Sequence, residues 1–304
     1  MKRIIAVLLC LVILIGTRSL TGCSSKEESL VPSTRTVVDM SGAEIKVPTQ
    51  IDKYCVLYSS AISICALLDK NMEHMCMCPT IYGGWTSLLC PDVEDHIIAV
   101  NKKTVTAEQS IEAGTQVVFC SSSTNQETIA SLQEAGIPCV DVGMKTADDL
   151  LRAVDIVATT FGTDHSRSVA SAYKEKFAYY QDYVKSCVQD IPENAIKSVL
   201  VIGDLADITG FGKNAYEAYW ASVAGLNYIV PSDDGASKVN LTMEQIFEFD
   251  PDVVIVETFD TSLLTEDSTW FTLRAYTDGR VLATPKALDN WSKPGAESIL
   301  YERC

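Results

Sequence analysis

Two series of short apolar runs, separated by a long stretch without a strand signal, most constrain how this chain can fold. In each series strand-like runs alternate with helix-like segments; the first series occupies residues 54–142 and the second residues 198–284. Strands that alternate with helices at this pace favour βαβ units and parallel sheets. The sequence therefore predicts an α/β fold with two lobes, each a sheet flanked by helices.

The stretch between the two series is predicted to be helical. Residues 146–161 and 166–190 contain no proline, and the second range carries apolar residues at helical spacing, such as Tyr173 and Phe177. A helix of 25 residues would be roughly 37 Å long. We expect this helix to join the two lobes as a spine, with a ligand cleft between the lobes.

The first 22 residues have the character of an export signal. Lys2 and Arg3 precede an apolar run from Ile4 to Ile15, and small residues lead up to Cys23. A helix over that run would span roughly 18 Å, which is short of the ~30 Å hydrocarbon core of a bilayer. Residues 20–23 read Leu-Thr-Gly-Cys and resemble a bacterial lipobox, so we expect cleavage after residue 22 and a lipid on Cys23. A plain signal peptide followed by a chance cysteine is the alternative.

The charge balance excludes one class of partner. The chain has 40 acidic and 24 basic side chains, a net charge of −16, which argues against a general nucleic-acid coat. Removing the signal takes away three basic residues and no acidic one, leaving 21 basic against 40 acidic side chains and a charge of −19. Such a body repels anions at long range. Near-neutral ligands are therefore favoured over highly anionic ones.

The cysteines do not form a regular disulfide framework. Eleven are present, and nine remain once Cys10 is lost with the signal and Cys23 carries lipid. An odd number cannot all pair within one chain. Most lie in apolar runs, where cysteine behaves as a small buried hydrophobe, so we interpret them mainly as free core thiols, with disulfides among them as the alternative.

Several segments follow one another in a recognisable order: a hairpin at residues 36–42, the segments 56–61, 121–127 and 132–138, the paired segments 242–246 and 250–256, and Trp-Ser-Lys-Pro at 291–294. In these segments and their order, residues 36–301 resemble the solute-binding proteins of ABC importers for iron siderophores, haem and cobalamin, the class III periplasmic binding proteins. This resemblance implies two Rossmann-like lobes joined by one long helix. It also implies capture of an iron complex (a siderophore, hydroxamate types among them, or haem) or a corrinoid between the lobes, and delivery to an ABC permease and its ATPase.

With this resemblance the chain divides into five parts: a signal peptide (1–22), a lipidated cysteine and tether (23–35), an N-terminal lobe (36–160), a spine helix (161–192) and a C-terminal lobe (193–304) whose last helix would be short. We expect a monomer, exported and lipid-anchored to the outer face of the cell membrane, with the periplasm as the alternative location. The sequence contains no Walker-type phosphate loop, Gly-x-Ser-x-Gly elbow or His-Glu-x-x-His zinc motif. It predicts neither an enzyme nor a bound cofactor.

Two glutamates are the candidate docking residues. In the family one glutamate on each lobe pairs with arginines of the permease, and the matching positions here are Glu108 and Glu244. A carboxylate and a guanidinium can pair through two hydrogen bonds, which fixes orientation as well as affinity. Each glutamate also follows a threonine at a predicted helix start, so it could instead be a capping residue or a favourable first-turn charge.

The candidate ligand contacts lie in loops after predicted strands, because ligands of open α/β sheets bind at the carboxyl ends of the strands. Aromatic rings would give flat contact to a macrocycle and hydroxyls would orient it; any one of them could instead be a packing residue. These candidates are Tyr58, Ser59, Ser60, Tyr82, Trp85, Lys102, Lys103, Ser122, Thr209, Phe211, Lys213 and Trp291.

A run rich in methionine and cysteine offers a different function. Residues 72–78 read Met-Glu-His-Met-Cys-Met-Cys, and thioether, imidazole and thiolate groups are ligands for Cu(I), zinc or haem iron. In a strand, however, alternate side chains point to opposite faces, which would divide such a cluster. We expect a core strand, with a metal-binding or ligand-sensing surface lipoprotein that uses His74, Met75, Cys76 and Cys78 as the alternative.

Overall fold

The computed structural model describes residues 33–70, 72–79, 97–122, 124–231, 236, 238–257, 262, 264, 269–284 and 293–296. All helices and strands below belong to the unit Thr34–Cys304. The predicted signal peptide, Cys23 and the candidate residues Tyr82, Trp85 and Trp291 lie outside the described residues. None of the helices in the described part of the chain is both long and apolar enough to cross a membrane.

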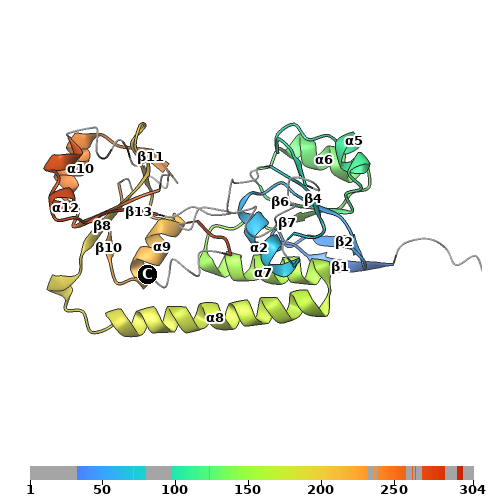
Figure 1. Cartoon of the computed structure of the whole chain (residues 1–304), viewed down its shortest axis with the longest axis horizontal. Helices are drawn as coiled ribbons and strands as arrows, with labels where there is room; N and C mark the ends of the chain where they lie inside the picture. The colour runs from blue at the N-terminus through green and yellow to red at the C-terminus, as the bar shows by residue number, and fades with distance from the viewer. Residues whose placement is uncertain are drawn as a thin grey trace, which may run out of the picture. The chain divides into compact units, whose positions relative to one another are not determined.

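The first lobe contains a hairpin and a parallel sheet (Figure 1). The hairpin pairs β1 (Thr34–Val38) with β2 (Glu44–Pro48), so regular structure begins two residues before the expected end of the tether. The sheet has the order β5-β4-β3-β6-β7, and every neighbouring pair in it is parallel. Its strands are β3 (Tyr54–Val56), β4 (Met75–Cys78), β5 (Ile98–Ala99), β6 (Val117–Cys120) and β7 (Cys139–Asp141).

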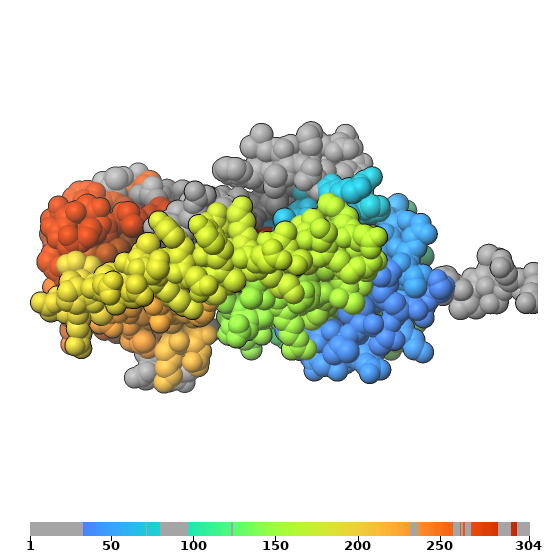
Figure 2. All heavy atoms as spheres, turned by 90° about the horizontal axis from the view of Figure 1, so that it is seen from below, coloured from blue at the N-terminus to red at the C-terminus, as the bar shows by residue number. Residues whose placement is uncertain are grey.

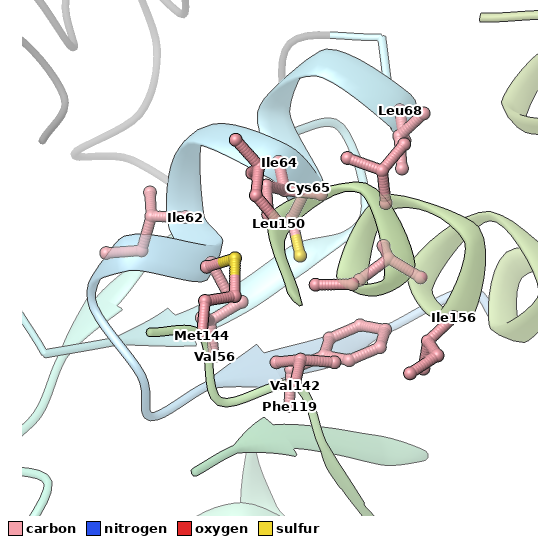
Figure 3. Packing of buried hydrophobic residues seen from close by; sticks show 14 of the residues in the cluster. Val56, Ile62, Ile64, Cys65, Leu68, Phe119, Val142, Met144, Leu150 and Ile156 are labelled. Atoms are coloured by element: carbon pink, nitrogen blue, oxygen red, sulfur yellow. The ribbon is translucent and has the colours of Figure 1, made fainter. Parts of the chain in front are cut away.

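Helices cover both faces of this sheet. On one face, α2 (Ser60–Leu68) and α7 (Ala147–Phe161) pack against alternate strand residues, among them Val56 and Phe119, as Figure 3 shows. On the other face, Leu132 of α6 (Gln126–Glu134) packs against Cys55 and Val118, close to the end of α5 (Ala107–Glu112). A sheet buried on both sides explains why its strands read as continuous apolar runs.

The expected spine is α8 (Asp164–Val188), a helix of 25 residues. Gly162 ends α7 with a positive φ of 64°, and Thr163 caps α8 by accepting a hydrogen bond from the backbone N–H of Ser166 at 3.0 Å. Figure 2 shows α8, in yellow-green and yellow, with one side open to solvent along its length. Its buried side includes Tyr173 and Phe177, the residues whose helical spacing predicted it.

The second lobe has a mixed sheet of order β11-β9-β8-β12-β13, with β10 also pairing with β8. Strands β8, β10, β12 and β13 are parallel, whereas β9 runs antiparallel to both β8 and β11. Its elements are β8 (Ser198–Asp204), β9 (Thr209–Phe211), α9 (Tyr216–Val223), β10 (Asn227–Tyr228), β11 (Lys238–Asn240), α10 (Met243–Phe249), β12 (Val253–Val256), α12 (Arg274–Thr277) and β13 (Val281–Ala283), together with the 3₁₀ turns η1 (Glu193–Ala195) and η2 (Trp270–Thr272). The α/β prediction with two lobes is confirmed; the antiparallel strands are an addition to it.

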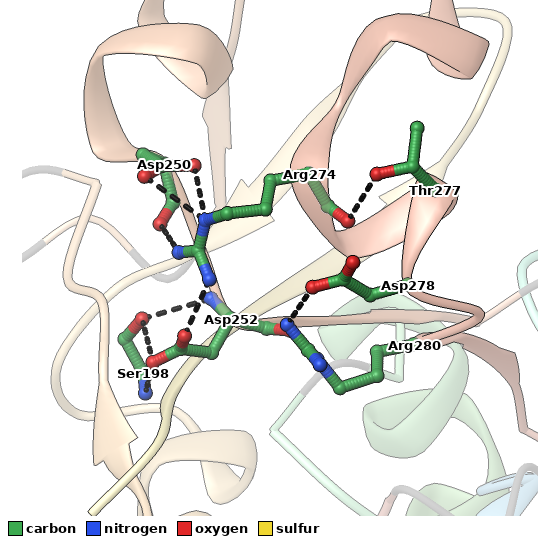
Figure 4. A network of polar contacts seen from close by, with 7 residues as sticks. All are labelled: Ser198, Asp250, Asp252, Arg274, Thr277, Asp278 and Arg280. Atoms are coloured by element: carbon green, nitrogen blue, oxygen red, sulfur yellow. Dashed lines mark hydrogen bonds and ion pairs between the residues drawn. The ribbon is translucent and has the colours of Figure 1, made fainter.

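A polar network fixes the amino-terminal edge of the second sheet (Figure 4). Asp252, directly before β12, accepts hydrogen bonds from the backbone N–H of Ser198 at 2.9 Å and from Nη1 of Arg274 at 2.7 Å. Arg274 also donates to Asp250, and Arg280 pairs with Asp278. These bonds lower the pKa of the Asp252 carboxyl below its ordinary value, Arg274 being the main cause.

Candidate ligand-binding site

In the first lobe, the loops that follow β3, β6 and β7 meet around a cavity of about 380 Å³. Tyr58 follows β3, Ser121 and Ser122 follow β6, and Gly143 follows β7. The hydroxyl of Tyr58 donates to the carbonyl oxygen of Met144 at 3.3 Å, which joins two of these loops. The cavity is lined by Met40, Tyr58, Ser121, Ser122, Asp141, Gly143, Met144, Lys145 and Asp149.

Backbone N–H groups hold the two carboxylates of this cavity in place. Asp141 accepts from the N–H of Gly143 at 2.8 Å, and Asp149 accepts from the N–H groups of Lys145 and Thr146 at 3.0 and 3.1 Å. Apolar, hydroxyl and carboxylate groups therefore surround the space, together with the single basic residue Lys145. Such a lining suits an organic ligand better than a bare ion.

Of the first-lobe candidates that can be placed, the structure brings Tyr58 and Ser122 to this cavity. Ser59 is the N-cap of α2 and Ser60 its first residue, directly beside the cavity but not in its lining. Lys102 and Lys103 lie in the turn after β5, where the carbonyl oxygen of Lys103 accepts from Asn125, and they do not reach the lining either. The predicted basic contribution of these two lysines to this cavity is therefore absent from the described structure.

In the second lobe, a buried charged group lies at the carboxyl end of β12. Glu257 directly follows β12, Glu217 lies in the first turn of α9, and the ammonium of Lys293 contacts both carboxylates; its distance to Oε2 of Glu257 is 3.2 Å. The two glutamate side chains are 1% and 2% exposed, whereas that of Lys293 is 30% exposed. Lys293 also lies 3.8 Å from the centroid of the Phe211 ring, a cation–π contact.

This environment changes the acidity of the group. Burial raises the pKa of Glu217 to about 7, although the ammonium of Lys293 opposes the shift. Burial also raises the pKa of Tyr228, and the charges of Glu217 and Glu257 raise it further. The Tyr228 hydroxyl donates to the carbonyl oxygen of Phe211 at 2.8 Å, which ties the charged group to the end of β9.

The second-lobe candidates do not all join this group. Phe211 does, but Thr209 lies at the other end of β9 and Lys213 in the loop before α9. In that loop only glycine fits at position 212, since a Cβ there would lie 1.9 Å from the carbonyl oxygen of Ala236.

The prediction did not include Glu217 or Glu257 among the site residues. Glu257 could have been found, because it directly follows the apolar run of β12; nothing local in the sequence marks Glu217.

Beyond Lys293, the same segment contacts elements of the first lobe and the spine. The backbone N–H of Ala296 donates to Oγ of Ser63 on α2 at 3.0 Å, and its carbonyl oxygen accepts from the hydroxyl of Tyr173 on α8 at 3.2 Å. Residues 293–296 thus connect the charged group of the second lobe to α2 and α8.

The methionine and cysteine run forms β4, and Met75, Cys76, Met77 and Cys78 are all at most 5% exposed. Cys76 and Met77 pack on the α6 side of the sheet, whereas Met75 and Cys78 pack with α2 and α7. His74, directly before β4, places Nδ1 2.5 Å from Oδ1 of Asp69. Within the described ranges, no three His, Cys, Asp or Glu side chains come together as a metal site.

Glu108 and Glu244 occupy equivalent places in the two lobes. Each is the second residue of its helix, α5 or α10, in the shared sequence Thr-x-Glu-Gln. In both helices the threonine and the glutamine, not the glutamate, form the capping box. The backbone N–H of each glutamate lowers the pKa of its carboxyl, and both side chains are fully exposed. The capping-box alternative for these two glutamates is therefore wrong, whereas the lowered pKa values agree with the alternative of a favourable first-turn charge.

The comparisons with known proteins agree with this architecture. The family model for periplasmic binding proteins matches residues 101–288. The molybdate-binding protein MolA of Haemophilus influenzae is 20% identical over 296 residues, covering 87% of this chain and 81% of MolA.

Solved structures show the same fold. The molybdate-bound structure of MolA has a TM-score of 0.76 at 16% identity, covering 88% of this chain and 89% of MolA. A periplasmic solute-binding protein of Veillonella parvula has a TM-score of 0.74 at 20% identity (89% and 84% covered), and the vitamin B12-binding protein BtuF of Vibrio cholerae one of 0.65 at 14% identity (83% and 95% covered). The chain therefore belongs to the periplasmic binding protein family, in the class III group that serves ABC importers.

Proposed function

We propose that this exported solute-binding protein captures a metal chelate, namely a ferric siderophore, haem or a corrinoid, between its two lobes and delivers it to the permease and ATPase of an ABC importer. The chelate is taken at the carboxyl edges of the two sheets. Cys23 carries the lipid that holds the protein at the outer face of the membrane, and one copy of the chain suffices for binding.

The observation that carries this proposal is the cavity of about 380 Å³ in the first lobe. Its volume lies within the range of roughly 300–1,000 Å³ that is usual for small-molecule sites. Met40 and Met144 offer adaptable apolar contact, and the hydroxyls of Tyr58 and Ser122 offer hydrogen bonds. Such a lining fits the organic shell of a chelate, which presents both apolar surface and carbonyl oxygens.

The alternative function on the methionine and cysteine run receives no support. All four side chains of β4 are buried in the core, and burial raises the pKa of the Cys76 thiol, which disfavours the thiolate that metals bind. We therefore propose no second function for this segment.

Isothermal titration with a panel of probes tests the ligand class. The mature chain would be titrated with a neutral ferric trihydroxamate, haemin, dicyanocobinamide and sodium molybdate. We expect a micromolar or tighter dissociation constant for one of the first three, with a matching rise in melting temperature. Binding of molybdate with no binding of any chelate would contradict the proposal.

A matched pair of tyrosine variants tests the location. Tyr58→Phe removes one hydroxyl from the cavity lining, and we expect it to weaken chelate binding by roughly 2–10-fold, the usual effect of one hydrogen bond. Tyr183→Phe makes the same change on the exposed side of α8, where the residue is 52% exposed, and should leave binding unchanged. Equal affinities of the two variants would place the ligand elsewhere.

A further inference from the structure

Carboxylates outnumber ammonium groups at both proposed ligand contacts, namely the carboxyl edges of the two sheets. In the first lobe, the cavity lining contains Asp141, Asp149 and a single basic side chain, Lys145. In the second lobe, Glu217 and Glu257 share the ammonium of Lys293. The two edges therefore repeat one arrangement, two carboxylates to one ammonium, on unrelated sequence segments.

In the second lobe, burial strengthens the effect of this excess of carboxylates. Both glutamate side chains are almost fully shielded from water, so their charges are weakly screened. Above pH 7, where Glu217 with its pKa of about 7 is mostly ionised, one ammonium can offset only one of the two charges. A second lysine, Lys238, lies 5.6 Å from the same Phe211 ring but on an exposed strand position, where water screens its charge. The ammonium of Lys293 is thus already paired with Glu217 and Glu257, so it offers no net positive charge to a ligand.

In the first lobe, hydrogen bonds fix the carboxylates. Asp141 and Asp149 accept backbone N–H groups of the same cavity-lining loop, at 2.8 to 3.1 Å. The side chain of Lys145 is exposed, so its charge is diluted by solvent. An anion in this cavity would face two positioned carboxylates and one solvent-exposed ammonium.

We propose that these two carboxylate pairs, Asp141 with Asp149 and Glu217 with Glu257, are a charge filter that admits neutral and cationic ligands and rejects oxyanions. This inference rests on the proposed function, in that it takes the two carboxyl edges as the place where the ligand binds. It narrows that proposal to neutral and cationic siderophores and corrinoids, because haem carries two propionate carboxylates. Like charges brought close together discriminate against the wrong ligand, most strongly where burial limits the screening of the repulsion by water, as it does at Glu217 and Glu257. With this filter the chain would disfavour an oxyanion such as molybdate, although it shares its fold with the molybdate-binding protein MolA.

The test is a gain of anion binding, with molybdate as the probe. The double variant Glu217→Gln/Glu257→Gln keeps the size of both side chains and leaves Lys293 with an uncompensated positive charge. Glu248→Gln, on the exposed side of α10 in the same lobe, removes a surface charge and controls for the overall net charge. Isothermal titration at pH 7.5 and low ionic strength would measure all three proteins, with circular dichroism to establish folding.

We expect the double variant to bind molybdate at least about tenfold more tightly than the wild type, and Glu248→Gln to match the wild type. Equal affinity of the double variant and the wild type, including no measurable binding by either, overturns the inference. If the double variant fails to fold, Asp141→Asn is the equivalent test in the first lobe, and we expect it also to bind molybdate more tightly than the wild type. Its fold should be kept, because asparagine can still accept the hydrogen bond from the N–H of Gly143.

A charge series on one scaffold separates this inference from the proposed function. A ferric trihydroxamate with a free amine, its N-acetyl form and its N-succinyl form carry charges of about +1, 0 and −1 around the same iron centre. We expect wild-type affinity to fall at least about tenfold from the acetylated to the succinylated form, and the double variant to lose this preference. A gain of molybdate binding without binding of any chelate would refute the proposed ligand class and leave the filter standing.

Discussion

Arg274 donates a hydrogen bond of 2.7 Å from Nη1 to Oδ1 of Asp252, and this bond attaches α12 to the start of β12. Because Asp252 also accepts from the N–H of Ser198, one carboxylate holds two neighbouring strands and a helix together. Figure 4 shows how closely the partners converge on it.

We expect Arg274→Met to lower the melting temperature by about 2–5 °C, since it removes charge-assisted hydrogen bonds from Asp252 and Asp250. The loss should shrink in acid. The pKa of Asp252 is lowered in the folded protein, so its contribution is present above the ordinary value of 3.8 and is lost as the pH falls further. Differential scanning calorimetry at pH 7 and pH 3 would measure both effects.

Arg167→Met is the control for this prediction. Arg167 pairs with Asp164 on α8 and donates to the carbonyl oxygen of Gly162 at 2.8 Å, both at the exposed surface, so its removal should change the melting temperature by less than about 1 °C. Equal losses for the two variants would show that the Arg274 network contributes no more than a surface ion pair.

Reversing the charges of Glu108 and Glu244 should stop transport without affecting ligand capture. The two carboxylates lie at the exposed amino ends of α5 and α10, free of the capping box, where each can pair with a guanidinium of the permease. For Glu108→Arg/Glu244→Arg we expect uptake by whole cells to fall at least about tenfold while the dissociation constant of the ligand stays within twofold of the wild type.

The same two helices supply the control. Glu112 and Glu248 lie four residues further along α5 and α10, and both are exposed. The variant Glu112→Arg/Glu248→Arg changes the net charge equally and should retain uptake. If both double variants transport normally, the docking assignment is wrong; if both fail, the effect comes from overall charge.

The stability of the protein should depend on pH through Glu217. Burial raises the pKa of this carboxyl from 4.5 to about 7 in the folded state, among the neighbouring Lys293, Glu257 and Tyr228. Between these values the folded protein binds more protons than the unfolded chain, so the free energy of unfolding should fall as the pH rises from about 4.5 to 7. Urea denaturation at pH 5, 6, 7 and 8 would measure the slope.

In Glu217→Gln this slope should become shallower, whatever the variant's absolute stability, because its side chain cannot titrate. Glu248→Gln should keep the slope of the wild type. An unchanged slope in Glu217→Gln would assign the pH dependence to other groups.

Thiol reactivity should divide the cysteines that the structure places. Cys187 on α8 is exposed, whereas Cys55, Cys65, Cys76, Cys78, Cys120 and Cys139 are buried. Burial raises the pKa of the Cys55 and Cys65 thiols, and that of Cys139 to about 12, which suppresses the reactive thiolate. With a maleimide at pH 7 and peptide mapping by mass spectrometry, we expect rapid labelling of Cys187 and labelling of the six others only in denaturant. Rapid labelling of any of the six in the folded protein would contradict this.

The sequence predicted the elements whose signals are local. Within the first series of alternating segments, the apolar run at residues 117–120 forms strand β6 and the helix-like segment at residues 107–112 forms α5, as that alternation predicts. The long helix was placed two residues late, at 166 rather than 164, because Thr163 caps it and an Asp-His start carries no apolar signal. The strand-like run at residues 208–209 overlaps β9 (Thr209–Phe211), but the antiparallel direction of β9 and the whole of β11 escaped prediction, because strands of three residues are too short to show a period.

The candidate site was predictable to a smaller extent, for a different reason. Tyr58, Ser122 and Phe211 follow strands or end them, so the rule on carboxyl ends of strands found them. The pairing of Glu217 with Lys293 joins residues 76 positions apart, and no local pattern encodes it. Lys102 and Lys103 follow a strand as well, but that strand, β5, is the edge strand, separated from β3 by β4, and neither lysine belongs to the cavity lining.

The strand order of the first lobe affects how the exported chain folds. Central β3 pairs with β6, so Cys55 meets its partner Val118 only after some sixty further residues have been released from the export machinery. Until then, every thiol that the finished core shields is open to oxidants and to neighbouring thiols. Folding and oxidation therefore compete in time, and the yield of active protein should depend on the redox state of the compartment into which the chain emerges.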